Sequence, residues 1–244
     1  MLLLGAVACQ KSGSLHPQNP NSPGISGNMT TDDAADLAAG ALSTSSNGVA
    51  EVAADATLNA ANIGLGHFRC GTIRSDTISR KSSAGSQYTY SYNLTYNFQV
   101  ECDTAGKADS LSSNLAYSGS FSGPNLSSTN SGSSIFGVSG LLSTDTAYVI
   151  SGVYKSAGSF ASKVDTANHG SSNISIAITN LTLQKPRRAI ESGSAAISIT
   201  GSTPKHGAFS YTGTVVFNGN GTATVTINGT AYSINLNTGW RQRL

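Results

Sequence analysis

The chain has 244 residues, of which 11% are charged and 38% hydrophobic, and its formal net charge is +2. This balance lacks the concentrated basic surface of a nucleic-acid-binding protein, so no nucleic-acid partner is expected. Ser, Thr, Asn and Gly supply most of the polar groups, a composition that suits an extracytoplasmic β protein.

The chain opens with a short apolar segment that ends at a cysteine. Residues 1–8 read MLLLGAVA and precede Cys9, which is the order of a secretory signal and its small-residue cleavage site. The segment is too short to cross a bilayer, which takes about 20 apolar residues. Residues 9–29 are rich in Ser, Asn, Gly and Pro and predict a flexible tether. We interpret residues 1–8 as a signal-peptide remnant; a free N-terminal peptide with an incidental cysteine is the alternative.

Lipidation of Cys9 is the expected consequence of this signal. Each buried methylene contributes about 0.8 kcal/mol to membrane binding. One acyl chain therefore binds the protein to the membrane only marginally, whereas several chains anchor it stably. The predicted location is a bacterial cell envelope, where the N-terminal lipid binds an outer membrane and the protein faces the periplasm or the cell surface. The membrane is therefore the one expected partner, and the sequence identifies no ligand or protein partner.

Short Ala-rich helices are predicted within residues 30–62. The stretch TTDDAADLAAGAL offers Thr30 or Thr31 as the N-cap and places two aspartates in the first turn, where the helix dipole favours negative charge. GVAEVAADATLNAA has the same character, and Gly40 and Gly48 favour a break between the two segments. The expected buried stripe consists of Leu37, Leu42, Val49, Val52 and Leu58.

The hydrophobic period changes to two after residue 65. In YTYSYNLTYNFQVEC, apolar and polar residues alternate over a length that predicts one long, half-buried strand. Its first half carries an aromatic row, Tyr88, Tyr90, Tyr92 and Tyr96. We favour a core position for this row beneath the helices, and a surface for an apolar or carbohydrate ligand is the alternative.

Further strands follow with short connections. They are expected around residues 111–121, 127–140, 145–164, 172–184, 189–201 and 207–217. Asn228–Gly229 predicts a type I′ hairpin that pairs Val225 with Tyr232. The predicted fold is mainly β, a large antiparallel meander sheet over residues 63–240 that is open or strongly curled, and that forms one globular unit with the helices. A closed barrel is the alternative.

Cys70 and Cys102 remain as a pair once Cys9 is assigned to the anchor. An even pair in an oxidising compartment favours a structural disulfide, and two buried thiols or a metal site are the alternatives. A hairpin centred near Ser86 sets the two cysteines opposite each other.

The register of this first hairpin is a separate prediction. Strict pairing would put Arg74 and Asp76 on the aromatic face of the neighbouring strand. A bulge near Gly71 avoids this and pairs Ile73 with Phe98, so we expect the bulged register.

No motif of a known catalytic, nucleotide-binding or metal-binding site is present. The histidines His16, His67, His169 and His206 are far apart, and we expect solvated loop residues rather than a metal cluster. The basic stretch QKPRRAIES predicts a solvated turn, with an anionic partner such as a lipid head group or polysaccharide as the alternative. No catalytic residue, metal or cofactor is predicted.

Taken together, these features resemble a group of known proteins. The lipidated cysteine, the Pro/Asn tether, TTDDAADLAAGAL, YTYSYNLTYNF, YSGSFSGPNL and GNGTATVTINGTAYSINLNTG are similar to segments of uncharacterised secreted lipoproteins of Bacteroidetes-type bacteria. The resemblance covers most of the chain. It implies the envelope location and a β-rich fold, and it implies no activity.

Three functions are compatible with these patterns. The first is an envelope-anchored lipoprotein with a non-catalytic structural or binding role. The second is a carrier of a hydrophobic ligand held between sheet and helices, and the third is an envelope hydrolase without a recognised motif. A packed interface between sheet and helices favours the first and a large apolar cavity the second. Two carboxylates that face each other across a cleft favour the third.

Overall fold

The computed structural model describes residues 29–64, 66, 69–166 and 168–244. Two α-helices come first, α1 (Thr31–Leu42) and α2 (Val49–Gly64), joined by the short 3-10 turn η1 (Thr44–Ser46). The strands that follow are β1 (Ile73–Lys81), β2 (Thr89–Cys102), β3 (Ala108–Ser122), β4 (Leu126–Ser139), β5 (Ala147–Ser162), β6 (His169–Gln184), β7 (Ala189–Thr203), β8 (Gly207–Gly219), β9 (Thr222–Ile227), β10 (Thr230–Asn235) and β11 (Arg241–Arg243).

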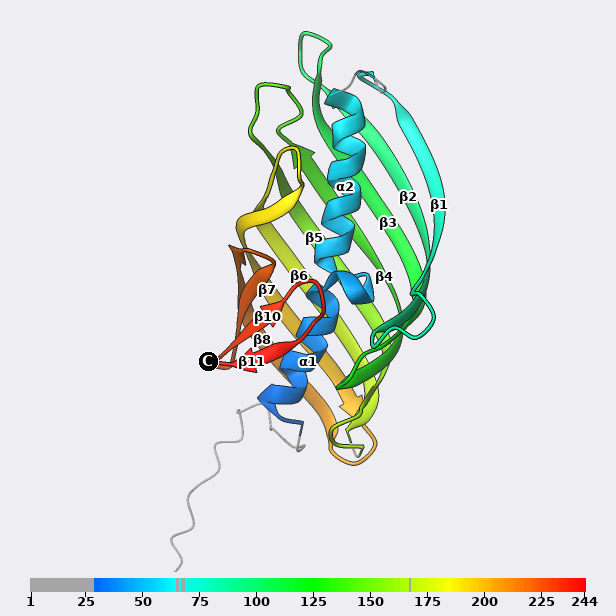
Figure 1. Ribbon diagram of the computed structural model, residues 1–244, viewed down its shortest axis with the longest axis vertical. Helices are drawn as coiled ribbons and strands as arrows, with labels where there is room; N and C mark the ends of the chain where they lie inside the picture. The colour runs from blue at the N-terminus through cyan, green and yellow to red at the C-terminus, as the bar shows by residue number, and fades with distance from the viewer. Residues whose placement is uncertain (1–28, 65, 67–68, 167) are drawn as a thin grey trace, which may run out of the picture.

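The strands form one antiparallel meander in which every strand pairs with its neighbours in the chain. β1 and β11 are the two edges and do not pair with each other, so the open sheet is confirmed over the closed barrel. Figure 1 shows the sheet curled around α1 and α2, which lie against its inner face. The last strand, β11, lies beyond the expected limit of the β region at residue 240.

The start of α1 follows from its first residues. Thr30 is the N-cap, and its hydroxyl accepts a hydrogen bond from the Asp33 amide while the Asp33 carboxylate accepts one from the Thr30 amide at 2.9 Å. This reciprocal pair satisfies two amides that have no partner within the helix. The break between the helices requires Gly48, because a Cβ there would lie 2.5 Å from the Ala41 carbonyl oxygen.

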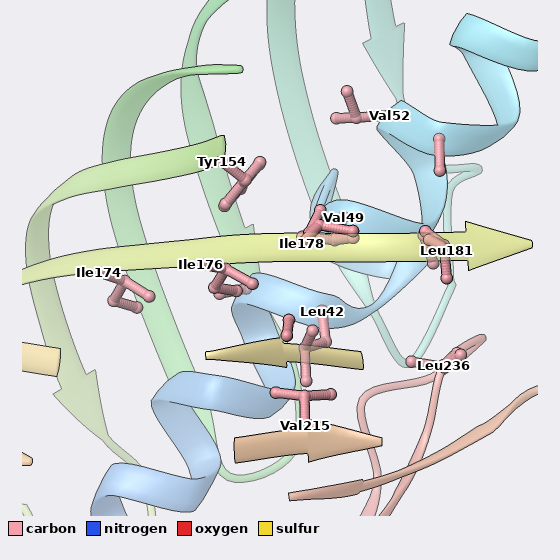
Figure 2. Packing of buried hydrophobic residues seen from close by; sticks show 14 of the residues in the cluster. Leu42, Val49, Val52, Tyr154, Ile174, Ile176, Ile178, Leu181, Val215 and Leu236 are labelled. Atoms are coloured by element: carbon pink, nitrogen blue, oxygen red, sulfur yellow. The ribbon is translucent and has the colours of Figure 1, made fainter. Parts of the chain in front are cut away.

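The core lies between the helices and the inner face of the sheet. Four of the five residues of the expected stripe are buried, namely Leu37, Leu42, Val49 and Val52. Figure 2 shows Leu42, Val49 and Val52 among core residues that include Ile176 and Ile178 of β6.

The expectation for Leu58 was wrong, since its side chain is 46% exposed. The buried residues of this part of α2 are small, Ala53, Ala56 and Ala60. At about 100° per residue, Leu58 points away from that face. Alanines therefore bring α2 close to the large side chains of the sheet.

The predicted bulge near Gly71 was also wrong. Arg74 pairs with Phe98 and Ile73 with Gln99, so the first hairpin keeps strict register. Arg74, Asp76 and Arg80 of β1 consequently share the inner face with the aromatics of β2. Ile73 points outward and is 72% exposed. This position is tolerated because β1 is an edge strand, where its inward charges find partners such as the Arg74–Asp76 pair at 2.8 Å.

The disulfide between Cys70 and Cys102 is confirmed, with a Cα–Cα distance of 5.4 Å. It joins the turn before β1 to the end of β2, next to the hydrogen bond from the Gly71 amide to the Val100 carbonyl at 3.0 Å. The two cysteines are 32 residues apart in the sequence. In the chain-entropy model, closing a loop of this length contributes about 3.7 kcal/mol.

The last predicted hairpin is confirmed in detail. Val225 pairs with Tyr232, and Asn228 and Gly229 have φ angles of 47° and 82°. Both turn positions are therefore left-handed, as a type I′ turn requires.

Candidate functional site

Of the four tyrosines in the aromatic row, two lie in the core and two lie at its border. Tyr92 and Tyr96 are each 1% exposed and lie beneath the helices. Tyr88 and Tyr90 are half-buried and pack against the same core. Tyr90 also lines an open cleft of about 590 Å³ beside the β1–β2 connection, together with Phe121. The row is thus mainly core, and its first two members lie at the border of the core.

A cluster of charged groups joins the β1 edge of the sheet to α2; we name it the β1-edge cluster. Arg80 forms ion pairs with Glu51, at 2.8 Å between Nη1 and Oε1, and with Asp55. The Tyr96 hydroxyl donates a hydrogen bond to Asp55. Glu51 and Asp55 are one helical turn apart, so the guanidinium contacts both carboxylates at once.

Burial shapes the ionisation of this cluster. It raises the pKa of Glu51, although the Arg80 charge acts in the opposite direction. Burial alone would lower the pKa of Arg80, but Asp55 and Glu51 outweigh it and the pKa is raised. Arg80 is therefore a fixed cation, and the cluster is a tie between edge strand and helix.

The β11-edge cluster repeats this arrangement at the other end of the sheet. Arg241 holds Asp36 with two hydrogen bonds, 2.6 Å from Nε and 3.0 Å from Nη2. Its Nη1 lies 3.7 Å from Asp32, which accepts a 2.6 Å hydrogen bond from the Tyr232 hydroxyl. In both clusters an arginine of the edge strand contacts two carboxylates one turn apart, and a tyrosine of the next strand donates to one of them.

Neither cluster was predicted from the sequence. The helix carboxylates and their arginines are far apart in the chain. Of the four carboxylates only Asp32 was given a role, as a charge in the first turn of its helix. The spacing of four between Asp32 and Asp36, and between Glu51 and Asp55, was the signal that was available.

A network of buried hydroxyls lies between the two clusters, beneath the η1 turn. The hydroxyls of Tyr117 and Tyr154 are 2.6 Å apart, and Tyr154 also donates to the Asn47 carbonyl oxygen at 3.3 Å. Asn130 donates to Ser156 at 3.0 Å. Within the described residues, several buried polar side chains of this region have atoms without a hydrogen-bond partner: Asn47, Tyr92, Ser113, Asn130 and Ser134.

We expect ordered water in this region. A void of about 30 Å³ next to the network is lined by Ser46, Asn130, Ser156 and Ser172. That is room for a water molecule, and buried water typically makes two to four hydrogen bonds with polar groups that otherwise lack partners. A crystal structure at high resolution should show solvent density in this void. A void that is dry in such a map would contradict the expectation.

The inner-face tyrosines predict a sharp loss of stability at alkaline pH. Burial raises the pKa of the hydroxyls of Tyr92, Tyr96, Tyr117 and Tyr154. Each group stays neutral in the folded protein but ionises near pH 10 in the unfolded chain, so its stabilisation is complete below about pH 10 and is lost as the pH rises further.

Absorbance of phenolate and circular dichroism, followed together from pH 8 to 13, test this expectation. The absorbance of the four buried tyrosines should appear only as the secondary structure is lost. Gradual ionisation of all nine tyrosines of the chain in a protein with unchanged circular dichroism would contradict it.

A second open cleft lies between α2 and two turns of the sheet; we name it the arginine cleft. Its volume is about 660 Å³. Arg187 and Arg188 come from the β6–β7 turn and Glu191 from the start of β7, while Asn218 at the end of β8 and Asn220 of the β8–β9 turn lie on another side. The apolar residues of the lining include Ala50 and Ala54 of α2, Ile190 and Leu236, and polar residues such as Thr44, Gln184 and Asn237 also line it. Within the stretch QKPRRAIES, Lys185 to Arg188 form the expected turn between β6 and β7, and the two arginines line this cleft.

The outer face of the sheet carries a third opening, a shallow groove of about 630 Å³. Lys155 of β5 lies in it among small polar residues of neighbouring strands, such as Ser133, Asn173, Ser175 and Thr200. These residues are exposed except Ser175, which is half-buried. The groove is thus a hydroxyl-rich surface with one cation.

The remaining predicted residues are dispersed. His169 is the first residue of β6 and His206 lies in the turn between β7 and β8. The described part of the chain contains no group of three or more His, Cys, Asp or Glu side chains arranged to hold a metal ion. Of the three open clefts, only the arginine cleft has a carboxylate in its lining, Glu191. Cys9, residues 9–28 of the tether, His16 and His67 lie outside the described residues. Met29, the last residue of the predicted tether, is buried, and its carbonyl oxygen accepts a hydrogen bond from the Tyr211 hydroxyl.

No helix within the described residues has the length and apolar character needed to cross a membrane. Comparisons of this chain with models of protein families, with curated proteins and with solved structures find no match.

Proposed function

We propose that this protein is a lipid-anchored, non-catalytic binding protein of a bacterial cell envelope. The observation that carries the proposal is the filled inner face of the sheet. Two helices occupy that face, and an arginine cluster ties each edge strand to one of them. The sheet and helices form one body with its open clefts at the rim and on the outer face, which suits a scaffold that presents binding surfaces.

The envelope location rests on the N-terminal sequence. MLLLGAVAC followed by a polar tether has the order of a lipoprotein signal, and the Cys70–Cys102 disulfide fits an oxidising compartment. With acyl chains on Cys9, the tether would hold the folded domain at a short distance from the membrane surface.

Intact-mass spectrometry of the protein purified from the membranes of its host tests the location. The proposal predicts a chain that begins at Cys9, carries acyl groups and lacks two hydrogens because of the disulfide. A Cys9→Ser variant should leave the membrane fraction. An unmodified Cys9 in membrane-purified protein would contradict the proposed anchoring.

A carrier of a hydrophobic ligand is the second candidate. The arginine cleft favours it, because this opening of about 660 Å³ reaches the apolar side of α2 at Ala50 and Ala54. Its size falls within the usual range of ligand pockets, about 300–1,000 Å³. Native mass spectrometry of the same preparation separates the two candidates. A carrier would retain a bound molecule in a fixed ratio that denaturation releases.

A further inference from the structure

We propose that the arginine cleft binds an amphiphilic anion, whose phosphate or carboxylate pairs with Arg187 and Arg188 while its apolar part lies on α2. This inference deepens the proposed function, since it names the ligand class of a binding protein.

The two arginines are available for a ligand. Among the residues that the structure describes, neither guanidinium lies within ion-pair distance of a carboxylate, Glu191 included. The third cation of the turn, Lys185, is already engaged. It donates a 2.8 Å hydrogen bond to the Leu142 carbonyl oxygen and lies over the Tyr148 ring, 4.4 Å from the ring centre. The turn therefore directs one cation into the protein and leaves two at the cleft.

The backbone at Arg188 gives independent support. Its φ is +54°, a left-handed conformation that non-glycine residues adopt uncommonly and that asparagine tolerates best. The other non-glycine residues with positive φ in the described chain are all asparagines, Asn47, Asn180, Asn220 and Asn228. Folding alone would thus favour Asn or Gly at position 188. An arginine in a backbone conformation that disfavours it points to a role other than stabilising the fold.

The lining matches both parts of the ligand. Guanidinium groups bind phosphate and carboxylate with two parallel hydrogen bonds. With Glu191 included, the net charge of the lining is +1, so its electrostatic potential still favours an anion. Ala54 of α2 is half-buried and offers a small apolar surface, and the buried Ala50 and Leu236 lie beside it in the lining. A bare anion would leave that surface uncovered, and an uncharged apolar molecule would leave the arginines without a partner.

Calorimetric titration of the full-length chain carrying Cys9→Ser tests the inference without an attached lipid. The probes are dihexanoyl phosphatidic acid below its micelle concentration, dihexanoyl phosphatidylcholine with the same tails, and inorganic phosphate. Phosphatidic acid should bind at least tenfold more tightly than either of the others. Equal binding of phosphatidylcholine would overturn the role of the arginines, and equal binding of phosphate would overturn the role of the apolar surface.

Matched variants assign the binding to this cleft. R187Q/R188Q should weaken phosphatidic acid binding at least tenfold, whereas K205Q/R243Q, which removes the same charge at two exposed positions elsewhere, should not. A54F should block the amphiphile by occupying the apolar side. Arg188→Asn should weaken binding and leave the thermal midpoint equal or higher. Unchanged affinity of R187Q/R188Q for phosphatidic acid would overturn this inference. The result is independent of the intact-mass measurement, which tests acylation of Cys9 and therefore the proposed location.

Discussion

Replacement of Arg241 by Gln is expected to lower the free energy of unfolding by about 4 kcal/mol, because removing one partner of a buried ion pair leaves the other charge buried and unpaired. The Asp36 side chain is only 9% exposed, and Arg241 donates one hydrogen bond to each of its two oxygens, at 2.6 and 3.0 Å. Asn125 adds a longer hydrogen bond, 3.4 Å to Oδ1. The variant also removes the cation that lies over the Tyr232 ring.

Urea unfolding followed by circular dichroism measures this effect. Arg243→Gln is the matched control, since Arg243 lies on the same strand and is exposed, and surface substitutions usually change stability by about 0.5 kcal/mol or less. Arg241→Gln combined with Asp36→Asn should recover part of the loss. Equal stability of the Arg241 and Arg243 variants would contradict the role of the β11-edge cluster.

A methyl group at Gly132 is expected to cost about 3 kcal/mol, the upper end of the usual range for overpacking. A Cβ at this position of β4 would lie 2.1 Å from the Lys155 carbonyl oxygen and 2.5 Å from Cζ of Tyr117. The Lys155 carbonyl belongs to the backbone of the sheet, and the Tyr117 ring is held within the buried hydroxyl network. Moving either group away from the new Cβ would therefore cost stability. Gly132→Ala should therefore displace the ring of Tyr117.

Gly137→Ala provides the control on the same strand. A Cβ there would meet only the Ser151 carbonyl oxygen at 3.9 Å, an ordinary contact. Because alanine also restricts the unfolded chain more than glycine does, this variant should be neutral or more stable by up to about 1 kcal/mol. Thermal unfolding of both variants tests the comparison, and an equal midpoint for the two would contradict it.

The sequence predicted most of the sheet because its strands alternate strictly and its connections are short. The pairing of Val225 with Tyr232 followed from one Asn–Gly turn, since a two-residue turn fixes the register of both strands. The open form of the sheet could be expected only as the first of two alternatives. Closure depends on whether the first and last strands meet, which no local pattern encodes.

The errors arose where tertiary contacts override local pattern. Arg74 on the inner face contradicts a simple apolar alternation, yet its edge position and its pair with Asp76 make it stable. The arginine cleft could not be foreseen, because it unites α2 with two turns that lie far apart in the chain. The basic turn was visible in QKPRRAIES, but the apolar surface opposite it was not.

Hydrogen exchange of the α2 amides tests most directly the central claim that the helices form part of a permanent core. Ala53, Ala56 and Ala60 are fully buried against the sheet. Their amides should exchange only with global unfolding, with a free energy of opening equal to that from urea unfolding. Exchange of α2 at a much lower free energy, while β5 and β6 remain protected, would show that the helices open from the sheet and would contradict a permanently filled inner face.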